Sequence, residues 1–255
     1  MDTAVKAGSK RYGMAIDLDR CNGCGACSTA CAVENNVPPS RPTANERTGL
    51  TWMRVYRAGN GKPFPNHRSV YIPVPCQHCG KNTPCVSVCP QNAVDVDPET
   101  GIVSQIPARC LGCRYCMAAC PFHARYFNWF DPVWPDGMEN ALNPDVSVRM
   151  RGVVEKCNFC YARLQAAREK AAAAGRRDID PNDYVPACVE ACPAKAIVFG
   201  DLNDPRSEVS KLAKSPRAFR LLAKLGTEPK IYYLSARAWV RRLGDTAASL
   251  RREEA

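Results

Sequence analysis

Sixteen cysteines dominate the chemistry that this 255-residue sequence could perform. They fall into four groups of four; every group ends in C-x3-C, and a proline follows at once in the last three. The groups are Cys21, Cys24, Cys27 and Cys31; Cys76, Cys79, Cys85 and Cys89; Cys110, Cys113, Cys116 and Cys120; and Cys157, Cys160, Cys188 and Cys192. Thiols at such spacings can form disulfides, hold zinc or hold iron–sulfur clusters.

The third group reads C-x2-C-x2-C-x3-C-P, the spacing of bacterial ferredoxins. In that motif three cysteines wrap one cluster and the fourth ligates a neighbouring cluster. The x3 step is helical, so Cys120 lies one turn beyond Cys116 and faces away from the first cluster, and Pro121 then stops the helix. Zinc sites use C-x2-C pairs but need neither a third x2 step nor the proline. The spacing therefore favours iron–sulfur clusters, and the first group departs from it only in having Ala32 in place of proline.

The other two groups are split, with five residues between Cys79 and Cys85 and 27 between Cys160 and Cys188. Each still begins with C-x2-C and ends with C-x3-C, so each can supply three ligands to one cluster and one to another. His78 lies between two candidate ligands. It either tunes a cluster through a hydrogen bond or packs in the ligand loop for structural reasons.

Composition and charge narrow the class of protein. No run of 18 or more apolar residues is present, and the N-terminal stretch lacks an export signal. We therefore expect a chain that does not span a membrane and that is exported, if at all, with a signal-bearing partner. Thiols stay reduced in the cytosol, which disfavours a disulfide framework. The formal net charge is +10. Sixteen thiolates and four cubane cores would bring it to about +2, so the basicity is weak evidence for a nucleic-acid partner.

The elements that must position these cysteines repeat along the chain. Short apolar or alternating runs precede the groups, and similar runs follow the Cys-Pro pairs; the expected strands cover residues 11–18, 70–74, 125–129, 153–155 and 196–202. Residues 93–104 alternate on both sides of a Pro-Glu-Thr-Gly turn and predict a hairpin. One or two helical turns are expected at each C-x3-C. The fold class is therefore α+β, with duplicated ferredoxin-like modules that each hold two clusters.

The predicted modules are connected by longer segments. Residues 37–67 and 130–151 are expected to be irregular connecting loops. Strong helix formers predict a helix over 161–175. Residues 205–255 are expected to be a partly helical extension around a strand at 230–234, available for partner docking. Its basic residues are Arg237, Arg241, Arg242, Arg251 and Arg252.

Five stretches resemble a known family. They are MAIDLDRCNGCGACSTAC, PCQHCGKNTPCVSVCP, RCLGCRYCMAACPFHARYF, EKCNFCYAR and ACVEACPAKAIVFGDLNDP, spread over residues 14–204. Together they resemble the four-cluster iron–sulfur subunits of the dimethyl sulfoxide reductase superfamily. NPDVSVRMRGVVEKC further resembles the iron–sulfur parts of alternative complex III and of the menaquinone reductase complexes of sulfate reducers.

The resemblance implies that the first group pairs with the fourth, in a module of residues 1–36 with 152–204, and the second with the third, in a module of residues 68–129. It also implies four [4Fe–4S] clusters and a ligand set for each. The sets are Cys21, Cys24, Cys27 and Cys192 for cluster 1; Cys31, Cys157, Cys160 and Cys188 for cluster 2; Cys76, Cys79, Cys85 and Cys120 for cluster 3; and Cys89, Cys110, Cys113 and Cys116 for cluster 4. Cluster 3 is the one whose geometry and iron count are open, and [3Fe–4S] is its alternative. Five residues precede Cys85 where relatives commonly have four.

The resemblance also implies a function without catalytic residues of its own. Such a subunit relays single electrons between a large pterin-type subunit, or a multihaem cytochrome c, and a multi-span quinone-reactive membrane subunit that reduces menaquinone. Alternatives are the corresponding subunit of a polysulfide, dimethyl sulfoxide, sulfite or formate molybdopterin enzyme or of a hydrogenase, and a zinc-bound nucleic-acid binder. The expected location is the periplasmic face of the membrane, with the cytoplasmic face as the alternative.

Overall fold

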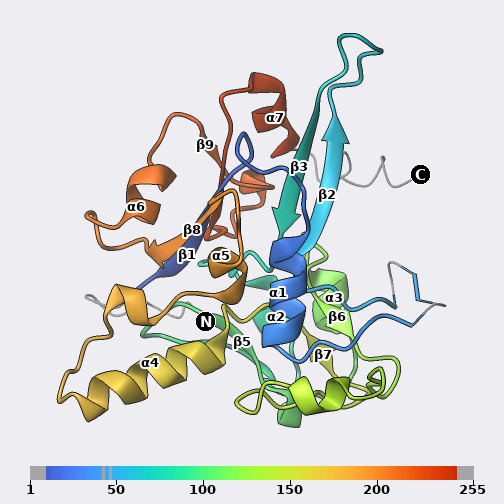
Figure 1. The fold of residues 1–255 in the computed structure, drawn as a ribbon, viewed down its shortest axis with the longest axis vertical. Helices are drawn as coiled ribbons and strands as arrows, with labels where there is room; N and C mark the ends of the chain where they lie inside the picture. The colour runs from blue at the N-terminus through green and yellow to red at the C-terminus, as the bar shows by residue number, and fades with distance from the viewer. Residues whose placement is uncertain (1–9, 42–43, 46–47, 246–255) are drawn as a thin grey trace.

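The computed structural model describes residues 10–41, 44–45 and 48–245. Its largest sheet has four strands in the order β8-β1-β10-β9 (Figure 1). The central strand β1 (Tyr12–Asp17) pairs antiparallel with β8 (Ile197–Asp201) and parallel with β10 (Ile231–Leu234), and β9 (Ala218–Phe219) pairs antiparallel with β10. The strand before the first cysteine group therefore lies beside the strand after the fourth group.

The central strands of this sheet are apolar on both faces. On one face, Met14 and Ile16 in β1 and their partners Ile231 and Tyr233 in β10 have no exposed surface. On the other face, Ala15 and Leu234 are buried as well. Such strands must be covered on both sides, which explains their interior position. The strands predicted at 11–18, 196–202 and 230–234 are confirmed. The last of these is built into the sheet, so part of the predicted C-terminal extension belongs to the core of the fold.

The remaining strands form three two-stranded sheets. They are β2 (Arg54–Gly59) with β3 (Ser69–Val74), β4 (Val94–Val96) with β5 (Val103–Gln105), and β6 (Tyr126–Phe127) with β7 (Val154–Glu155), all antiparallel. The hairpin predicted over 93–104 is confirmed. In the β6–β7 pair, Tyr126 lies opposite Glu155, so the strand after the third group pairs with the strand before the fourth.

The prediction that residues 37–67 form an irregular loop is wrong for residues 54–59. This stretch is β2, and it pairs along its whole length with β3. Trp52 and Met53, just before it, are buried. The strand escaped detection because two of its six residues are arginines and the flanking segments are rich in proline, which hides a short apolar alternation.

Four short helices carry the cysteine groups: α1 (Ala26–Glu34), α2 (Pro84–Ser87), α3 (Tyr115–Ala119) and α5 (Ala187–Glu190). α1 packs against α5, and α2 packs against α3. The groups that the resemblance pairs, first with fourth and second with third, are therefore side by side in the fold.

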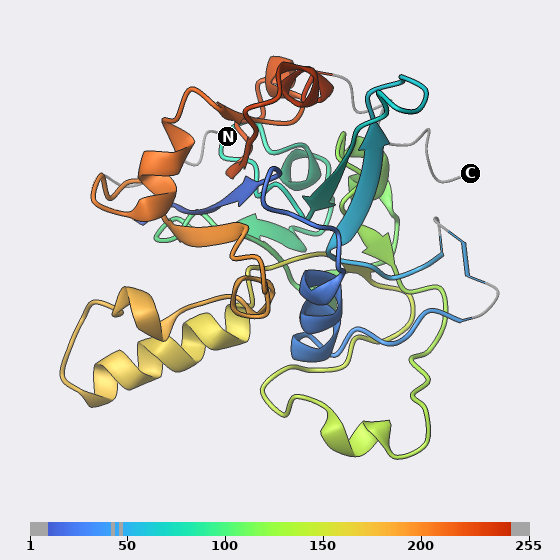
Figure 2. The ribbon, with the colours of Figure 1, turned by 45° about the horizontal axis from the view of Figure 1, so that its top comes forward.

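The other helices contain no cysteine of the four groups. The helix predicted over 161–175 is confirmed as α4 (Tyr161–Ala173), and α6 (Glu208–Ala213) packs against β8. α7 spans Ala238–Leu243, and short 3-10 turns cover Pro107–Arg109, Met138–Ala141, Pro181–Asp183 and Ala223–Leu225. Figure 2 shows α4 and the segment 130–151 on the side of the molecule away from the β2–β3 hairpin. Among the helices described, none is long and apolar enough to cross a membrane.

Candidate metal centres

The four cysteine groups share one loop geometry. In the first C-x2-C pair of each group, the residue before the second cysteine has a left-handed backbone: Gly23 (φ 74°), His78 (43°), Gly112 (76°) and Phe159 (56°). A left-handed residue lets a tight loop turn back on itself, and glycine does so most readily. Gly25, with φ 77°, gives the first group a second left-handed residue two positions after Gly23.

The residue type at this position follows from the surroundings of each loop. A Cβ on Gly112 would lie 2.4 Å from the backbone oxygen of Gly152, so this position has no room for a side chain. In the second and fourth groups, His78 and Phe159 are fully buried and their rings stack, with centroids 3.7 Å apart. These two ligand loops therefore touch each other through their side chains. The His78 Nδ1 atom accepts a hydrogen bond from the Val103 backbone N–H at 3.2 Å, which fixes the ring.

A second repeat follows each Cys-Pro pair. Asn92, His123 and Lys195 have φ near 50°, and each is followed by a buried alanine. The N–H of Ala93 donates to Cys89 Sγ at 3.2 Å and that of Ala196 to Cys192 Sγ at 3.3 Å. Amide N–H groups stabilise negative charge on ligand sulfur. The sequence interpretation noted the proline as a helix stop but missed this alanine, although an alanine three residues after proline recurs in all three groups.

Mutual repulsion between thiolates shows which cysteines are neighbours. Burial, followed by Cys21, Cys192 and Cys24, raises the pKa of Cys27 to about 11. The pKa of Cys31 is raised well above its usual range by burial and then by repulsion from Cys157, Cys188 and Cys160. The pKa of Cys79 is raised to about 12 by burial and then by repulsion from Cys76, Cys120 and Cys85. Burial raises the pKa of Cys116, and Cys110 and Cys89 add to it. The structure thus places cysteines of distant groups near one another, while Cys76, which the resemblance assigns to another set, also acts on the pKa of Cys157. The division into four ligand sets stays a prediction.

Two of these neighbourhoods border cavities at the surface. Cys21, Cys24, Cys27 and Cys192 line one cavity, and Cys89, Cys110, Cys113 and Cys116 line another, each of about 20 Å³. Within the described ranges, no group of three or more His, Cys, Asp or Glu side chains is placed to hold a single metal ion. All sixteen cysteines are free thiols. The donor set and the sulfur-directed N–H groups suit sulfur-ligated cofactors larger than one ion.

The neighbourhoods form a linear series. Cys24 in the first and Cys113 in the fourth are exposed, whereas all four cysteines of the second are buried, as are Cys76, Cys79 and Cys85 of the third. Repulsion also acts between neighbourhoods, although burial is the largest cause of each raised pKa. Cys27 of the first acts on Cys31 of the second, and Cys76 of the third acts on Cys157 of the second. Cys116 of the fourth acts on Cys85 of the third. The order is therefore first, second, third, fourth, with an exposed site at each end.

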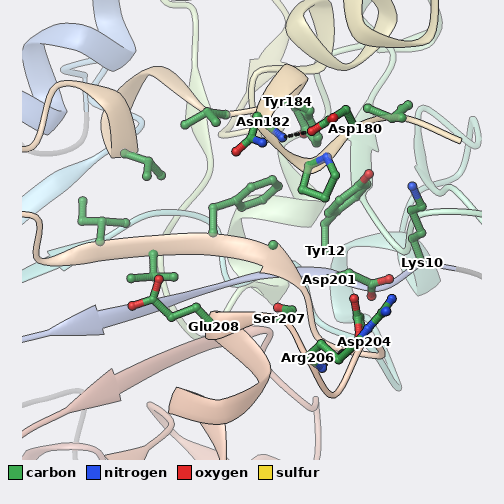
Figure 3. Close-up of a pocket in the computed structure, with 18 of the residues that line it drawn as sticks. Lys10, Tyr12, Asp180, Asn182, Tyr184, Asp201, Asp204, Arg206, Ser207 and Glu208 are labelled. Atoms are coloured by element: carbon green, nitrogen blue, oxygen red, sulfur yellow. Dashed lines mark hydrogen bonds and ion pairs between the residues drawn. The ribbon is translucent and has the colours of Figure 1, made fainter. Parts of the chain in front are cut away.

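A separate cleft of about 850 Å³ lies beside β8 (Figure 3). Its floor is aromatic: the Tyr12 and Tyr184 rings meet edge to face with centroids 5.0 Å apart, and Tyr12 stacks on Phe199. Its rim carries charges of both signs, including Lys10, Arg206, Asp201 and Glu208. The Tyr184 hydroxyl donates to the Phe159 carbonyl at 2.6 Å, so the floor of the cleft supports the fourth ligand loop. Nothing in the sequence pattern predicted this cleft.

Arg237 and Arg241 of the predicted basic region serve the fold, whereas Arg242 is exposed. Arg237 donates to the Asp19 carboxylate and to the carbonyls of Leu18 and Ser69, and Arg241 donates to the carbonyls of Ser235 and Ala236. Arg251 and Arg252 lie outside the described residues. Docking by this basic region stays a prediction.

Comparison with protein-family models gives two matches, both described as a 4Fe–4S dicluster domain. One covers residues 67–135, and the other covers residues 20–94 and 109–197. The chain belongs to the 4Fe–4S dicluster family. The two dicluster matches imply four [4Fe–4S] clusters, and the predicted ferredoxin-like mixture of helix and strand is confirmed at this level.

Curated relatives extend this comparison over nearly the whole dicluster protein. It is 58% identical, over 92% of both chains, to the iron–sulfur cluster-binding subunit of menaquinone reductase from Nitratidesulfovibrio vulgaris. It is 40% identical to the iron–sulfur subunit 1 of the Hdr-like menaquinol oxidoreductase from Archaeoglobus fulgidus, covering 88% of this chain and 83% of that one. The iron–sulfur subunit of the arsenate respiratory reductase from a Shewanella species is 34% identical, over 88% and 96% of the two chains. The predicted resemblance is confirmed.

Proposed function

We propose that this dicluster protein is the electron-transfer subunit of a menaquinone-linked respiratory complex, with four iron–sulfur clusters in series. The observation that carries the proposal is the linear order of the four cysteine neighbourhoods, buried in the middle and exposed at Cys24 and Cys113. A series with accessible ends and a buried middle suits transfer from one partner to another. The buried middle of the series keeps solvent away from the electrons between the two ends.

Each neighbourhood is proposed to hold one cluster with the ligand sets given above for clusters 1 to 4. The repulsions between thiolates link members of all four sets, and Cys113 joins the fourth set through the cavity that it lines with Cys89, Cys110 and Cys116. The clusters would supply one-electron carriers whose potentials depend on burial, hydrogen bonds to sulfur and nearby charge. The chain itself contributes the thiolates, the N–H groups of Ala93 and Ala196, and exclusion of water from the inner sites.

The longer gap in the second group does not remove a ligand from cluster 3. Thr83 Oγ1 donates to the Cys79 carbonyl at 3.1 Å, and Pro84 begins the helix that carries Cys85. Cys85, Cys76 and Cys120 all act on the pKa of Cys79. Four cysteines thus meet at this site, which supports [4Fe–4S] over the [3Fe–4S] alternative.

The partners are proposed from the relatives. The relative from Nitratidesulfovibrio vulgaris is a menaquinone reductase subunit at 58% identity, whereas the arsenate respiratory reductase subunit is 34% identical, which favours menaquinone over the reductase alternatives. We therefore propose a large pterin-type subunit or a multihaem cytochrome c at one end and a quinone-reactive membrane subunit at the other. The chain itself would perform no bond chemistry. Its place at the periplasmic face, reached by export with a partner, rests on the resemblance and stays a prediction.

The test uses the intact complex, purified anaerobically through a tag on this chain. The complex is reduced with dithionite, a menaquinone analogue is added, and cluster signals are followed by electron paramagnetic resonance. We expect the quinone to reoxidise the clusters in the complex and to leave the same signals unchanged in the isolated holoprotein. Signals that the quinone leaves unchanged in the complex as well would contradict the proposal.

A further inference from the structure

Arg125 is a buried arginine with unused donors. Its side chain is 3% exposed, and it follows the third cysteine group directly before β6. Nη2 donates to Gln105 Oε1. Nε and Nη1 have no hydrogen-bond partner among the described residues. Leaving N–H groups of a buried cation unpaired is costly, so acceptors that belong to the functional protein are expected at these two atoms.

The guanidinium lies where the third and fourth sites approach each other. Burial opposes its charge, yet Cys85, Cys116 and Cys76 raise the pKa of Arg125, and the Cys116 sulfur lies within reach of the guanidinium. Cys85 and Cys76 belong to the ligand set proposed for cluster 3, and Cys116 belongs to that of cluster 4. One fixed positive charge therefore faces two ligand sets at once.

Two other buried cations near these sites already have acceptors. Lys156 Nζ donates to the carbonyls of Val103 and Cys157, the latter at 2.7 Å, and Lys230 Nζ donates to the Gly101 carbonyl. Of the three, only Arg125 has atoms without a partner in the part of the chain that the structure describes. Arginine stays protonated at any pH the protein experiences, so its charge is constant.

We propose that Arg125 is a positioning residue of the relay: its Nε and Nη1 donate hydrogen bonds to sulfur at the third and fourth sites and raise the reduction potentials of both clusters. The inference rests on the proposed function. Reduction adds one electron to a cluster and makes it more negative by one charge, and no proton transfer is needed because Arg125 is already charged. A nearby cation stabilises the reduced form more than the oxidised form.

The test is a potentiometric titration of the anaerobic holoprotein, followed by electron paramagnetic resonance and accompanied by iron analysis. Arg125→Gln removes the charge, and Arg125→Lys keeps the charge but loses the planar donors. Arg168→Gln is the control, because Arg168 pairs with Asp97 and Glu99 and acts on no cysteine in the described contacts. The iron content of the wild type tests whether the four clusters are present. A failure of the proposed function can therefore be told apart from a failure of the inference about Arg125.

For Arg125→Gln with full iron, we expect two of the four cluster signals to shift to lower potential and the other two to stay in place. The expected shift is at least a tenfold fall in the ratio of reduced to oxidised cluster, which is 59 mV for one electron. Arg125→Lys should shift the same two signals less. The proposal is overturned if the potentials in Arg125→Gln are unchanged, or if all four signals shift equally. It is also overturned if both Arg125 variants lose iron and Arg168→Gln does not.

A second inference comes from the tip of the β2–β3 hairpin, residues 60–68, which rises beyond the rest of the fold in Figure 1. Phe64 at this tip is 91% exposed. The loop is nevertheless held by its own hydrogen bonds. Asn60 accepts from the N–H groups of Lys62 and Arg68 and donates to the Asn66 carbonyl, and Arg68 Nη1 donates to the carbonyls of Pro65 and His67. The fold therefore holds an apolar ring in water in one ordered loop.

The geometry points to this tip as a docking element for another protein subunit, with Phe64 filling an apolar pocket that has an acidic rim. An exposed aromatic side chain in a preorganised loop is typical of an interface anchor, because little entropy is lost on binding. The tip contains Lys62 and Arg68 and no acidic residue, so its charge complements an acidic rim.

The test is a salt wash of the intact complex. We expect Phe64→Ser to release the chain with its full iron content at a salt concentration that leaves the wild type bound. Leu225→Ser, a change of another exposed side chain (54% exposed), should behave as wild type. A Phe64→Ser complex that stays intact, or equal release of both variants, would overturn the inference. So would binding of the isolated wild-type holoprotein to anionic vesicles that Phe64→Ser abolishes, because the occupant would then be lipid.

Discussion

Two glycines in equivalent ligand loops should tolerate alanine very differently. Gly25 and Gly112 have almost the same backbone, with φ 77° and 76°. An alanine in this conformation costs about 1–2 kcal/mol. A Cβ at Gly25 would meet nothing within 4 Å, and the equivalent position in the third group is occupied by Arg114 with φ 62°. A Cβ at Gly112 would lie 2.4 Å from the Gly152 oxygen and 3.3 Å from a ring carbon of Phe127.

The contact at Gly112 therefore adds a penalty that Gly25→Ala does not have. Overpacking against a backbone atom that cannot move freely costs about 1–3 kcal/mol. The backbone and unfolded-state contributions are shared by both variants, so the difference between them isolates this contact. Thermal midpoints of the anaerobic holoproteins, followed by absorbance at about 400 nm, measure it. At about 2–4 °C per kcal/mol, we expect Gly112→Ala to lose its clusters about 2–12 °C below Gly25→Ala.

The same pair of variants gives a clear refutation. If both lose absorbance at the same temperature, or if Gly25→Ala is the less stable, the close approach of Gly112 to Gly152 does not hold the third ligand loop. Iron analysis after partial heating adds a second readout. The clusters of Gly112→Ala should be lost first at the site lined by Cys110 and Cys113.

Two further predictions concern ligand crossover and alkaline stability. Cys120→Ser should alter the same cluster signal as Cys79→Ser and leave the signal altered by Cys110→Ser intact; loss of the Cys110-dependent signal would assign Cys120 to its own group. Burial, and then Asp201, raises the pKa of Tyr12 to about 12. The unfolded chain ionises its tyrosines near pH 10, so stability should fall between about pH 10 and 12 by up to 1.4 kcal/mol per pH unit for this residue. Tyr12→Phe should flatten that fall in denaturant titrations, with Tyr71→Phe as the control for loss of a hydroxyl, and an unchanged slope would argue against the shift.

The sequence predicted features that depend on residues close together in the chain. Cysteine spacing, the helical turn between Cys116 and Cys120, and the hairpin at 93–104 are set within about a dozen residues. The left-handed residue in each C-x2-C loop could be anticipated at Gly23 and Gly112, since glycine favours that conformation. It could not be anticipated at His78 and Phe159, where the stacking of two distant loops compensates for the backbone.

Features that depend on distant partners were missed. β2 is a strand because β3 lies beside it, and β10 is interior because β1 and β9 flank it. The convergence of cysteines from different groups came from the family resemblance. The spacing alone could not show that α1 packs against α5 and α2 against α3. Nor could it show that Arg125, in a run of mixed residues after the third group, is buried between two ligand sets.

The central claim is that sixteen cysteines hold four iron–sulfur clusters in series. Analysis of iron and acid-labile sulfide in the anaerobically purified chain tests it most directly. The account predicts about 16 irons and about 16 sulfides per chain, four of each for every cluster. A fully folded chain with far fewer than about 12 irons, or one that binds zinc in place of iron at these cysteines, would contradict it.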